Sequence, residues 1–167
     1  MPTETQEIVR AAIQLECDGR EFYRKAAAAS ASDLARGTFE ALADDELRHI
    51  EYIREVSVCG ETLRTVNQRT YARLRGIFAD APDQVRREAA EAADDLAALN
   101  VAIDIEERSR AAYEALSHEV EPASLRTLCE LLAGAEQFHR QLLENVVEYL
   151  EHPSDFFARE ERWVVEG

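Results

Sequence analysis

The chain repeats itself at an offset of 90 residues, and this internal duplication constrains its fold more than any other feature of the sequence. In each copy a tyrosine follows a glutamate after seven residues, and a Glu-x-x-His motif begins 30 residues after that same glutamate. The matched positions are Ala12/Ala102, Ile13/Ile103, Glu16/Glu106, Arg20/Arg110, Tyr23/Tyr113, Leu42/Leu132, Ala43/Ala133, Glu46/Glu136, His49/His139 and Val56/Val146. Only six glycines and four prolines interrupt a sequence rich in helix formers, so each copy is predicted to be a helical hairpin.

The first hairpin has clear boundaries in the sequence. Apolar residues at helical spacing predict a first helix over about residues 4–29 and a second that runs through Leu34 to about Val58. Between them residues 30–33, of which Ser30, Ser32 and Asp33 are polar, break the pattern and offer a cap for the second helix. Because the connection is short, the two helices are expected to lie antiparallel and side by side.

The second hairpin is expected to follow a long crossover. The helical pattern weakens after residue 60, with one short helical piece predicted at 68–78. Pro82 can occupy the first turn of the third helix, which is expected to end near His118. Pro122 can do the same for the fourth helix, ending near residue 151. An all-α four-helix bundle with one long connection has the ferritin-like topology, which is the predicted fold.

The last residues are expected to form a separate short helical tail. The bundle should occupy residues 1–152 and the tail residues 153–167. Phe156, Phe157 and Trp163 make this tail too apolar to remain in solvent. We therefore expect it to pack on the bundle or on a partner subunit.

Charge and cysteine content exclude several classes of function. The 34 acidic and 19 basic residues give a formal net charge of −15, which disfavours nucleic-acid and anionic-membrane partners and favours cations. No run approaches the ~18 apolar residues of a membrane span, and the first residues lack signal-peptide features, so a cytoplasmic location is expected. Cys17, Cys59 and Cys129 form no Cys-x-x-Cys pair, which predicts reduced, structural thiols rather than a zinc ribbon or redox dithiol.

The two Glu-x-x-His motifs have the spacing of metal ligands on a helix. Residues at i and i+3 share one face, so Glu46 projects beside His49 and Glu136 beside His139. A single motif of this kind is usually a solvent-exposed pair on a helix surface. Its duplication at matched spacing, within apolar stripes, favours the interpretation that each pair holds one metal ion.

Four glutamates are predicted to converge inside the bundle, because each lies among apolar residues of its helix. Buried carboxylates cost several kcal/mol each when they lack a partner, whereas two divalent cations would balance four negative charges. The candidate metal ligands are Glu16, Glu46, His49, Glu106, Glu136 and His139. Mixed oxygen and nitrogen donors suit two iron or manganese ions, and zinc could occupy the same ligands.

Other polar residues have supporting or unrelated roles in this interpretation. Tyr23 and Tyr113 lie two turns after a ligand glutamate, where a buried hydroxyl can donate to a carboxylate; core packing is the alternative. His118 and His152 have no glutamate three residues before them and are not expected to bind metal. Glu107 points about 100° away from its neighbour in the site and is expected to form a salt bridge.

At these positions the chain resembles the rubrerythrin group of ferritin-like proteins. The resemblance lies in the segments AIQLECDGREFYRKA, FEALADDELRHIEYI, AIDIEERSRAAYEAL and LLAGAEQFHRQLLE. It implies a carboxylate-bridged di-iron centre, with Glu46 and Glu136 as the bridging members, and commonly the reduction of hydrogen peroxide. It also implies a homodimer. The chain departs from classical members at Ser109, where they carry an additional glutamate, and in lacking a rubredoxin-like Cys-x-x-Cys domain.

Three classes of function fit these features. The first is a rubrerythrin-type di-iron oxidoreductase that reduces peroxide with electrons from an external, rubredoxin-like donor. The second is a non-catalytic iron-binding or iron-handling protein, which would oxidise each iron once as it is loaded. The third is a structural bundle that holds zinc and shows neither behaviour.

Overall fold

The computed structural model describes residues 4–58, 94–120 and 123–153, and these residues form four helices and no strand. The helices are α1 (Glu4–Ala29), α2 (Asp33–Val58), α5 (Asp95–Glu119) and α6 (Ala123–Glu151). The predicted all-α four-helix fold is therefore confirmed. The expected helical piece at 68–78 and the tail after Pro153 lie outside the described residues.

Two serines shape the turn between α1 and α2. The Ser30 hydroxyl donates to the Ala26 carbonyl, 2.8 Å away, and so satisfies one of the last carbonyls of α1. Ser32 begins α2, since its carbonyl accepts from the Arg36 N–H at 2.9 Å and its hydroxyl lies 3.4 Å from the Ala35 N–H. The predicted break at 30–33 thus connects two neighbouring helices in only a few residues.

α5 begins later than the sequence pattern suggested. Asp94 has an extended backbone, and its carboxylate accepts from the N–H groups of Leu96 and Ala97, which caps the helix. The expected start at Pro82 is therefore wrong for this helix, and Pro82 itself lies outside the described residues. Asp95 in the first turn accepts from the Ser32 N–H at 2.7 Å, so the start of α5 is attached to the turn of the first hairpin.

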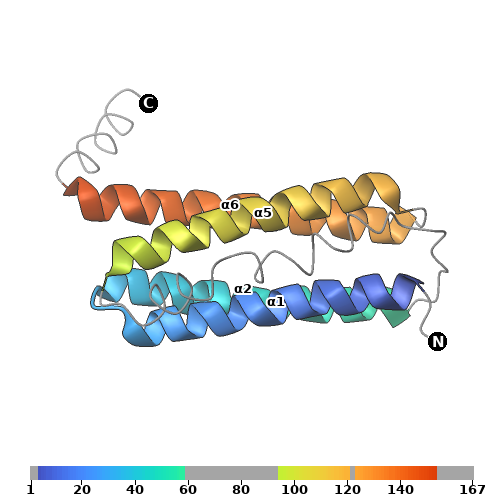
Figure 1. Ribbon diagram of the computed structural model, residues 1–167, viewed down its shortest axis with the longest axis horizontal. Helices are drawn as coiled ribbons and strands as arrows, with labels where there is room; N and C mark the ends of the chain where they lie inside the picture. The colour runs from blue at the N-terminus through green and yellow to red at the C-terminus, as the bar shows by residue number, and fades with distance from the viewer. Residues whose placement is uncertain (1–3, 59–93, 121–122, 154–167) are drawn as a thin grey trace, which may run out of the picture.

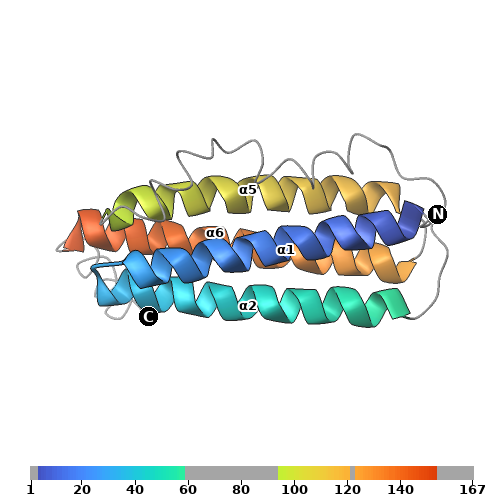
Figure 2. The same ribbon diagram turned by 60° about the horizontal axis from the view of Figure 1, so that its bottom comes forward.

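The two hairpins pack as two layers along one long axis. α1 and α2 form one layer, and α5 and α6 form the other (Figures 1 and 2). α2 ends and α5 begins at opposite ends of the bundle, so these two helices run in the same direction, whereas α1 with α2 and α5 with α6 are antiparallel (Figure 1). This is the ferritin-like order predicted for two hairpins with a long crossover.

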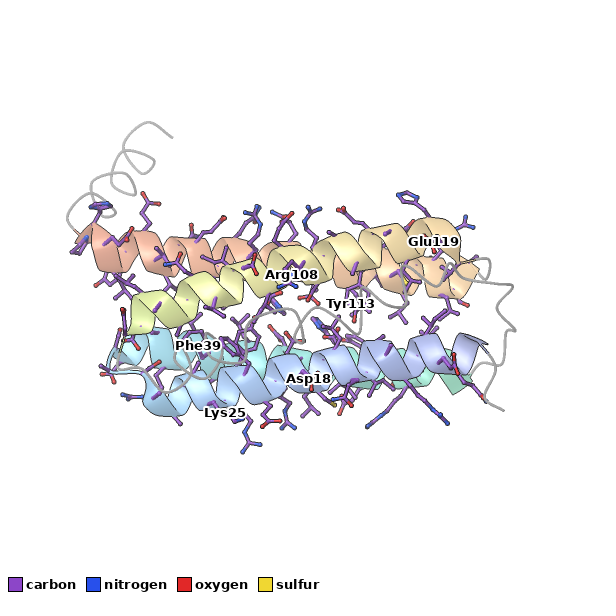
Figure 3. All side chains as sticks on the ribbon, in the orientation of Figure 1. Asp18, Lys25, Phe39, Arg108, Tyr113 and Glu119 are labelled. Carbon is purple, nitrogen blue, oxygen red and sulfur yellow. The ribbon has the colours of Figure 1, made fainter. Side chains whose placement is uncertain are left out.

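The core fills the space between the layers. Phe39 and Tyr113 lie between the hairpins, whereas Lys25 projects into solvent, where it pairs with Glu21 at 2.7 Å (Figure 3). Tyr23 stacks on Phe39 with ring centroids 6.1 Å apart, and both side chains are completely buried. None of the described helices combines the length and hydropathy that a membrane span requires.

The sequence repeat is also a structural repeat. Residues 12–20 and 102–110 show the same succession of buried, intermediate and exposed positions, and so do residues 41–49 and 131–139. Equivalent side chains of the two hairpins therefore face the same environment, and the centre of the bundle has approximate twofold symmetry.

Candidate metal centre

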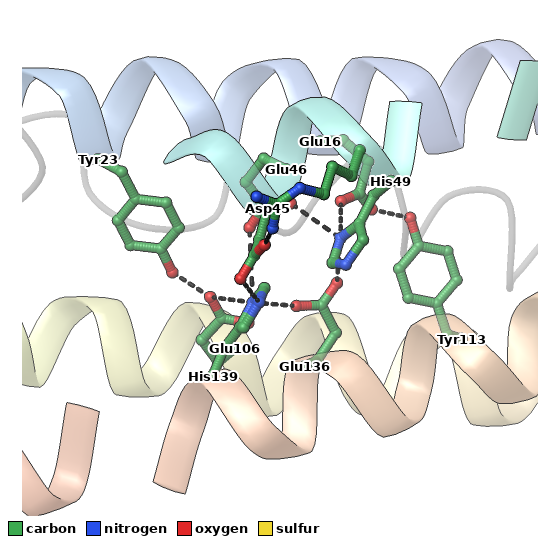
Figure 4. Close-up of polar contacts among 10 residues, drawn as sticks. Glu16, Tyr23, Asp45, Glu46, His49, Glu106, Tyr113, Glu136 and His139 are labelled. Atoms are coloured by element: carbon green, nitrogen blue, oxygen red, sulfur yellow. Dashed lines mark hydrogen bonds and ion pairs between the residues drawn. The ribbon is translucent and has the colours of Figure 1, made fainter. Parts of the chain in front are cut away.

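The six predicted ligands meet at the centre of the bundle (Figure 4). α1 and α5 each contribute one glutamate, whereas α2 and α6 each contribute a glutamate and a histidine. All six side chains are buried, with between 2% and 6% of each residue exposed. They are Glu16, Glu46, His49, Glu106, Glu136 and His139.

His49 marks one half of the cluster. Its Nδ1 atom lies 3.0 Å from Glu16 Oε2 and 3.2 Å from Glu46 Oε2. Glu136 of the other hairpin approaches the same nitrogen at 3.9 Å through Oε1. Three carboxylates from three helices therefore surround one imidazole nitrogen.

His139 marks the other half, and the arrangement is repeated. Its Nδ1 atom lies 3.3 Å from Glu136 Oε2, 3.5 Å from Glu106 Oε1 and 3.9 Å from Glu46 Oε1. The two imidazole rings stack with centroids 5.3 Å apart and an angle of 19° between their planes. The two halves are thus adjacent.

The geometry gives the glutamates two different positions. One group of ligand atoms, all within 4.8 Å of one another, comes from Glu16, Glu46, His49 and Glu136; the second comes from Glu46, Glu106, Glu136 and His139. Glu46 and Glu136 belong to both groups and can bridge two metal ions. The i, i+3 spacing did not reveal that Glu16 would join His49 and Glu106 would join His139.

Two buried tyrosines connect the hairpins through this cluster. The Tyr23 hydroxyl donates to Glu106, and the Tyr113 hydroxyl donates to Glu16 (Figure 4). Each tyrosine therefore orients the terminal glutamate of the opposite hairpin, meaning the one (Glu16 or Glu106) that belongs to only one of the two ligand groups. The sequence predicted a carboxylate partner for each hydroxyl but could not say which glutamate it would be.

Without a cation, the cluster must retain protons. Burial raises the pKa of Glu46 well above its ordinary value, and the charge of Glu16 adds to the shift. Burial and the charge of Glu106 raise the pKa of Glu136 in the same way. Burial also raises the pKa of Glu16, but hydrogen bonds with Glu46 and His49 outweigh it, so that this pKa is lowered. Burial lowers the pKa of His139, but its close contact with Glu106 prevails and raises it.

The residues fit a pair of metal ions. Four carboxylates balance two divalent cations, and two imidazoles add neutral donors to a mixed oxygen and nitrogen set. The buried His139 Nδ1 atom has no hydrogen-bond partner among the described residues, although carboxylate oxygens of Glu46, Glu106 and Glu136 surround it. A cation between these atoms would satisfy all of them.

One side of the cluster borders a small cavity between α1 and α5. Glu16, Glu46, Glu106 and Glu136 line it together with four other residues, which are Leu15, Gly19, Ile105 and Ser109. It has room for a molecule about the size of water. Gly19 and Ser109 are equivalent in the repeat, so small residues flank the carboxylates on both helices.

Asp45 was not predicted to belong to this region. Its Oδ2 atom lies 3.6 Å from His139 Nε2, whereas the glutamate carboxylates approach Nδ1 of the same ring (Figure 4). Position 45 is acidic only in the first hairpin, because its equivalent is Ala135. Comparison of the two halves for differences, rather than for matches, would have found it.

The remaining polar residues lie elsewhere. Glu107 pairs with Arg110 at 2.7 Å, as predicted. His118 and His152 are exposed at or near helix ends and do not join the cluster. Cys129 is a free, buried thiol whose pKa burial raises to about 12. Cys17 is also free, and Cys59 lies outside the described residues.

Comparison with known families agrees with this geometry. The family model described as Rubrerythrin matches residues 7–96, just over half of the chain. The chain belongs to the rubrerythrin family. Searches of curated proteins and of solved structures gave no significant match.

The family match covers only the first part of the cluster. It includes Glu16, Glu46 and His49 and ends before Glu106. In this rubrerythrin-family chain, the assignment of the other ligands therefore rests on the internal repeat and on their convergence with the first three. Together these observations indicate a di-metal protein.

Proposed function

We propose that this chain binds two iron ions through Glu16, Glu46, His49, Glu106, Glu136 and His139 and reduces hydrogen peroxide to water. The observation that carries the proposal is the presence of two overlapping ligand groups that share Glu46 and Glu136. Membership of the rubrerythrin family supports iron as the metal and peroxide as the oxidant. Manganese and zinc remain alternatives for the same ligands.

Two bound iron ions would supply the two electrons that peroxide reduction consumes, and two protons complete the formation of two water molecules. The chain itself shields the site from bulk solvent, because the ligand residues are at most 6% exposed. Tyr23 and Tyr113 hold the terminal glutamates in place and keep their own protons, since burial raises the pKa of both phenols well above 10.

A small cavity adjoins the carboxylates of the proposed site. It lies between α1 and α5, beside Gly19 and Ser109, and has room for a molecule about the size of water. We propose that a rubredoxin-type iron–thiolate centre supplies the electrons, because the 167 residues themselves contain no Cys-x-x-Cys pair that could form one.

The test is peroxide consumption by the iron-loaded protein, measured alone and then with a rubredoxin and its reductase. We expect a single burst without the donor and sustained turnover with it. Glu46→Gln should abolish both, whereas Glu40→Gln, which changes an exposed residue of the same helix, should alter neither.

Other outcomes would contradict the proposal. If peroxide is not consumed and each loaded iron is oxidised once by dioxygen, the chain handles iron rather than reducing peroxide. Sustained consumption without a donor, accompanied by oxygen release, would indicate catalase activity.

A further inference from the structure

One half of the metal centre has a carboxylate beside its histidine that the other half lacks. The Nε2 atom of His139 lies 3.6 Å from Asp45 Oδ2. Within the described part of the chain, His49 makes its ion-pair contacts only through Nδ1. The residue equivalent to Asp45 in the second hairpin is Ala135, which has the same intermediate exposure but no carboxylate.

Asp45 is held in place by a second contact. It projects from α2 toward α6, and its other oxygen, Oδ1, forms an ion pair with Arg48 one turn further along α2. At 3.6 Å, Oδ2 lies just outside hydrogen-bond range of the ring, so the hydrogen bond requires a small rotation of this 31% exposed side chain. Arg48 also has no counterpart, because Phe138 occupies the equivalent position.

This contact has a defined effect on a histidine ligand. His139 directs Nδ1 toward the three carboxylates of its half-site, so the neutral ring must carry its proton on Nε2 to bind metal through Nδ1. A carboxylate that accepts this N–H fixes the tautomer and the ring orientation and makes the ligand nitrogen a stronger donor. Asp45 can do this for His139, whereas Ala135 cannot do it for His49.

We propose that Asp45 positions His139 and makes the metal site formed with Glu106 and His139 bind more tightly than the site formed with Glu16 and His49. The approximate twofold symmetry of the ligands would otherwise make the two sites nearly equal. This inference rests on the metal-binding part of the proposed function and does not depend on the reaction catalysed.

The experiment is a calorimetric titration of the metal-free, full-length protein with Co²⁺. Wild-type protein should bind two ions in two resolved steps. Asp45→Ala should weaken the tighter step by about tenfold and leave the weaker step unchanged, because outer carboxylate partners typically contribute 10- to 100-fold in affinity. Asp45→Asn should restore part of the loss, since its carbonyl oxygen can still accept from Nε2.

Asp44→Ala is the matched control. Asp44 is the preceding residue of α2 and is exposed, so the variant removes the same charge without touching His139. Its two binding steps should match those of the wild type. The reverse variant Ala135→Asp should tighten the weaker step by supplying the missing carboxylate beside His49.

A second measurement reports on the hydrogen bond itself. In the cobalt-loaded protein, each ligand imidazole should give one shifted N–H proton signal. One of the two should exchange slowly with solvent in the wild type and rapidly in Asp45→Ala.

Unchanged affinities in Asp45→Ala, or an equal loss in Asp44→Ala, would overturn the role of Asp45 while leaving the di-metal site intact. A wild-type protein that binds no cobalt would instead overturn the metal centre itself.

Discussion

At the residue scale, the features of the cluster follow from six ionisable side chains placed where water is scarce. Glu46 and Glu136 each face the carboxylates of both halves, and burial raises the pKa of both side chains well above the ordinary value. The same shared position makes them the natural bridging ligands. Glu16 and Glu106 each face one half and receive a hydrogen bond from a tyrosine of the opposite hairpin.

This difference predicts unequal effects of substitution on metal content. Glu46→Gln or Glu136→Gln removes a ligand from both groups and should lower the content from two ions per chain to one or none. Glu16→Gln leaves the group of Glu46, Glu106, Glu136 and His139 complete, so it should retain at least one ion. Elemental analysis after anaerobic loading and desalting measures the content.

The control for this series is Glu40→Gln, an exposed change on α2 that should keep two ions. Two ions per chain in both Glu46→Gln and Glu136→Gln would show that these residues are not bridging ligands.

At the element scale, the helix boundaries show where sequence analysis succeeds and where it fails. α1 and α2 end where their apolar spacing and the break at residues 30–33 predicted. The start of α5 was placed too early, because the sequence before Asp94 consists of good helix formers and several acidic residues could serve as the cap. At this start Asp95 also contacts Ser32, more than 60 residues earlier, and no local pattern contains such a contact.

That contact predicts a measurable contribution to stability. Asp95→Ala removes the acceptor of the Ser32 N–H at 2.7 Å and of the Ala31 N–H at 3.3 Å. Hydrogen bonds to charged groups contribute about 1.5–3 kcal/mol, so the free energy of unfolding should fall by an amount in this range. Urea denaturation in the presence of a chelator measures it.

Asp104→Ala provides the comparison on the same helix. Asp104 is exposed and pairs only with Arg108, at 3.3 Å among the described residues, so its removal should change the free energy by less than about 0.5 kcal/mol. Equal losses in the two variants would show that Asp95 does not join the hairpins.

At the scale of the whole molecule, the fold and the candidate site were predictable because the hairpin and its ligand motif occur twice in the sequence. One Glu-x-x-His motif is ambiguous, but a second at the same spacing fixes the topology of two hairpins and brings four glutamates to one level of the bundle. What the repeat could not supply was the pairing across hairpins, such as Tyr23 with Glu106. The repeat also gave no indication of Asp45, because the equivalent residue in the second hairpin is Ala135.

The stability of the whole bundle should depend on pH in opposite ways with and without metal. In the metal-free protein, Glu46 and Glu136 have pKa values raised above the ordinary 4.5, and His139 has one raised above 6.5. A group with a raised pKa in the folded state stabilises the protein fully below its unfolded pKa and loses that contribution as the pH rises through the folded pKa. The lowered pKa of Glu16 acts in the opposite sense but only below about pH 4.5. The metal-free bundle should therefore melt at a lower temperature at pH 8 than at pH 6.

Bound cations reverse this dependence of stability on pH, since they require ionised carboxylates and compete with protons. At pH 8 the metal-loaded protein should melt at a higher temperature than the metal-free protein. Each bound ion adds about 2.7 kcal/mol to the free energy of unfolding when the free metal concentration is a hundredfold above the dissociation constant. Thermal melts of both forms at the two pH values measure the difference. A metal-free protein that is as stable at pH 8 as at pH 6, and unaffected by iron, would show that these carboxylates are solvated and hold no metal.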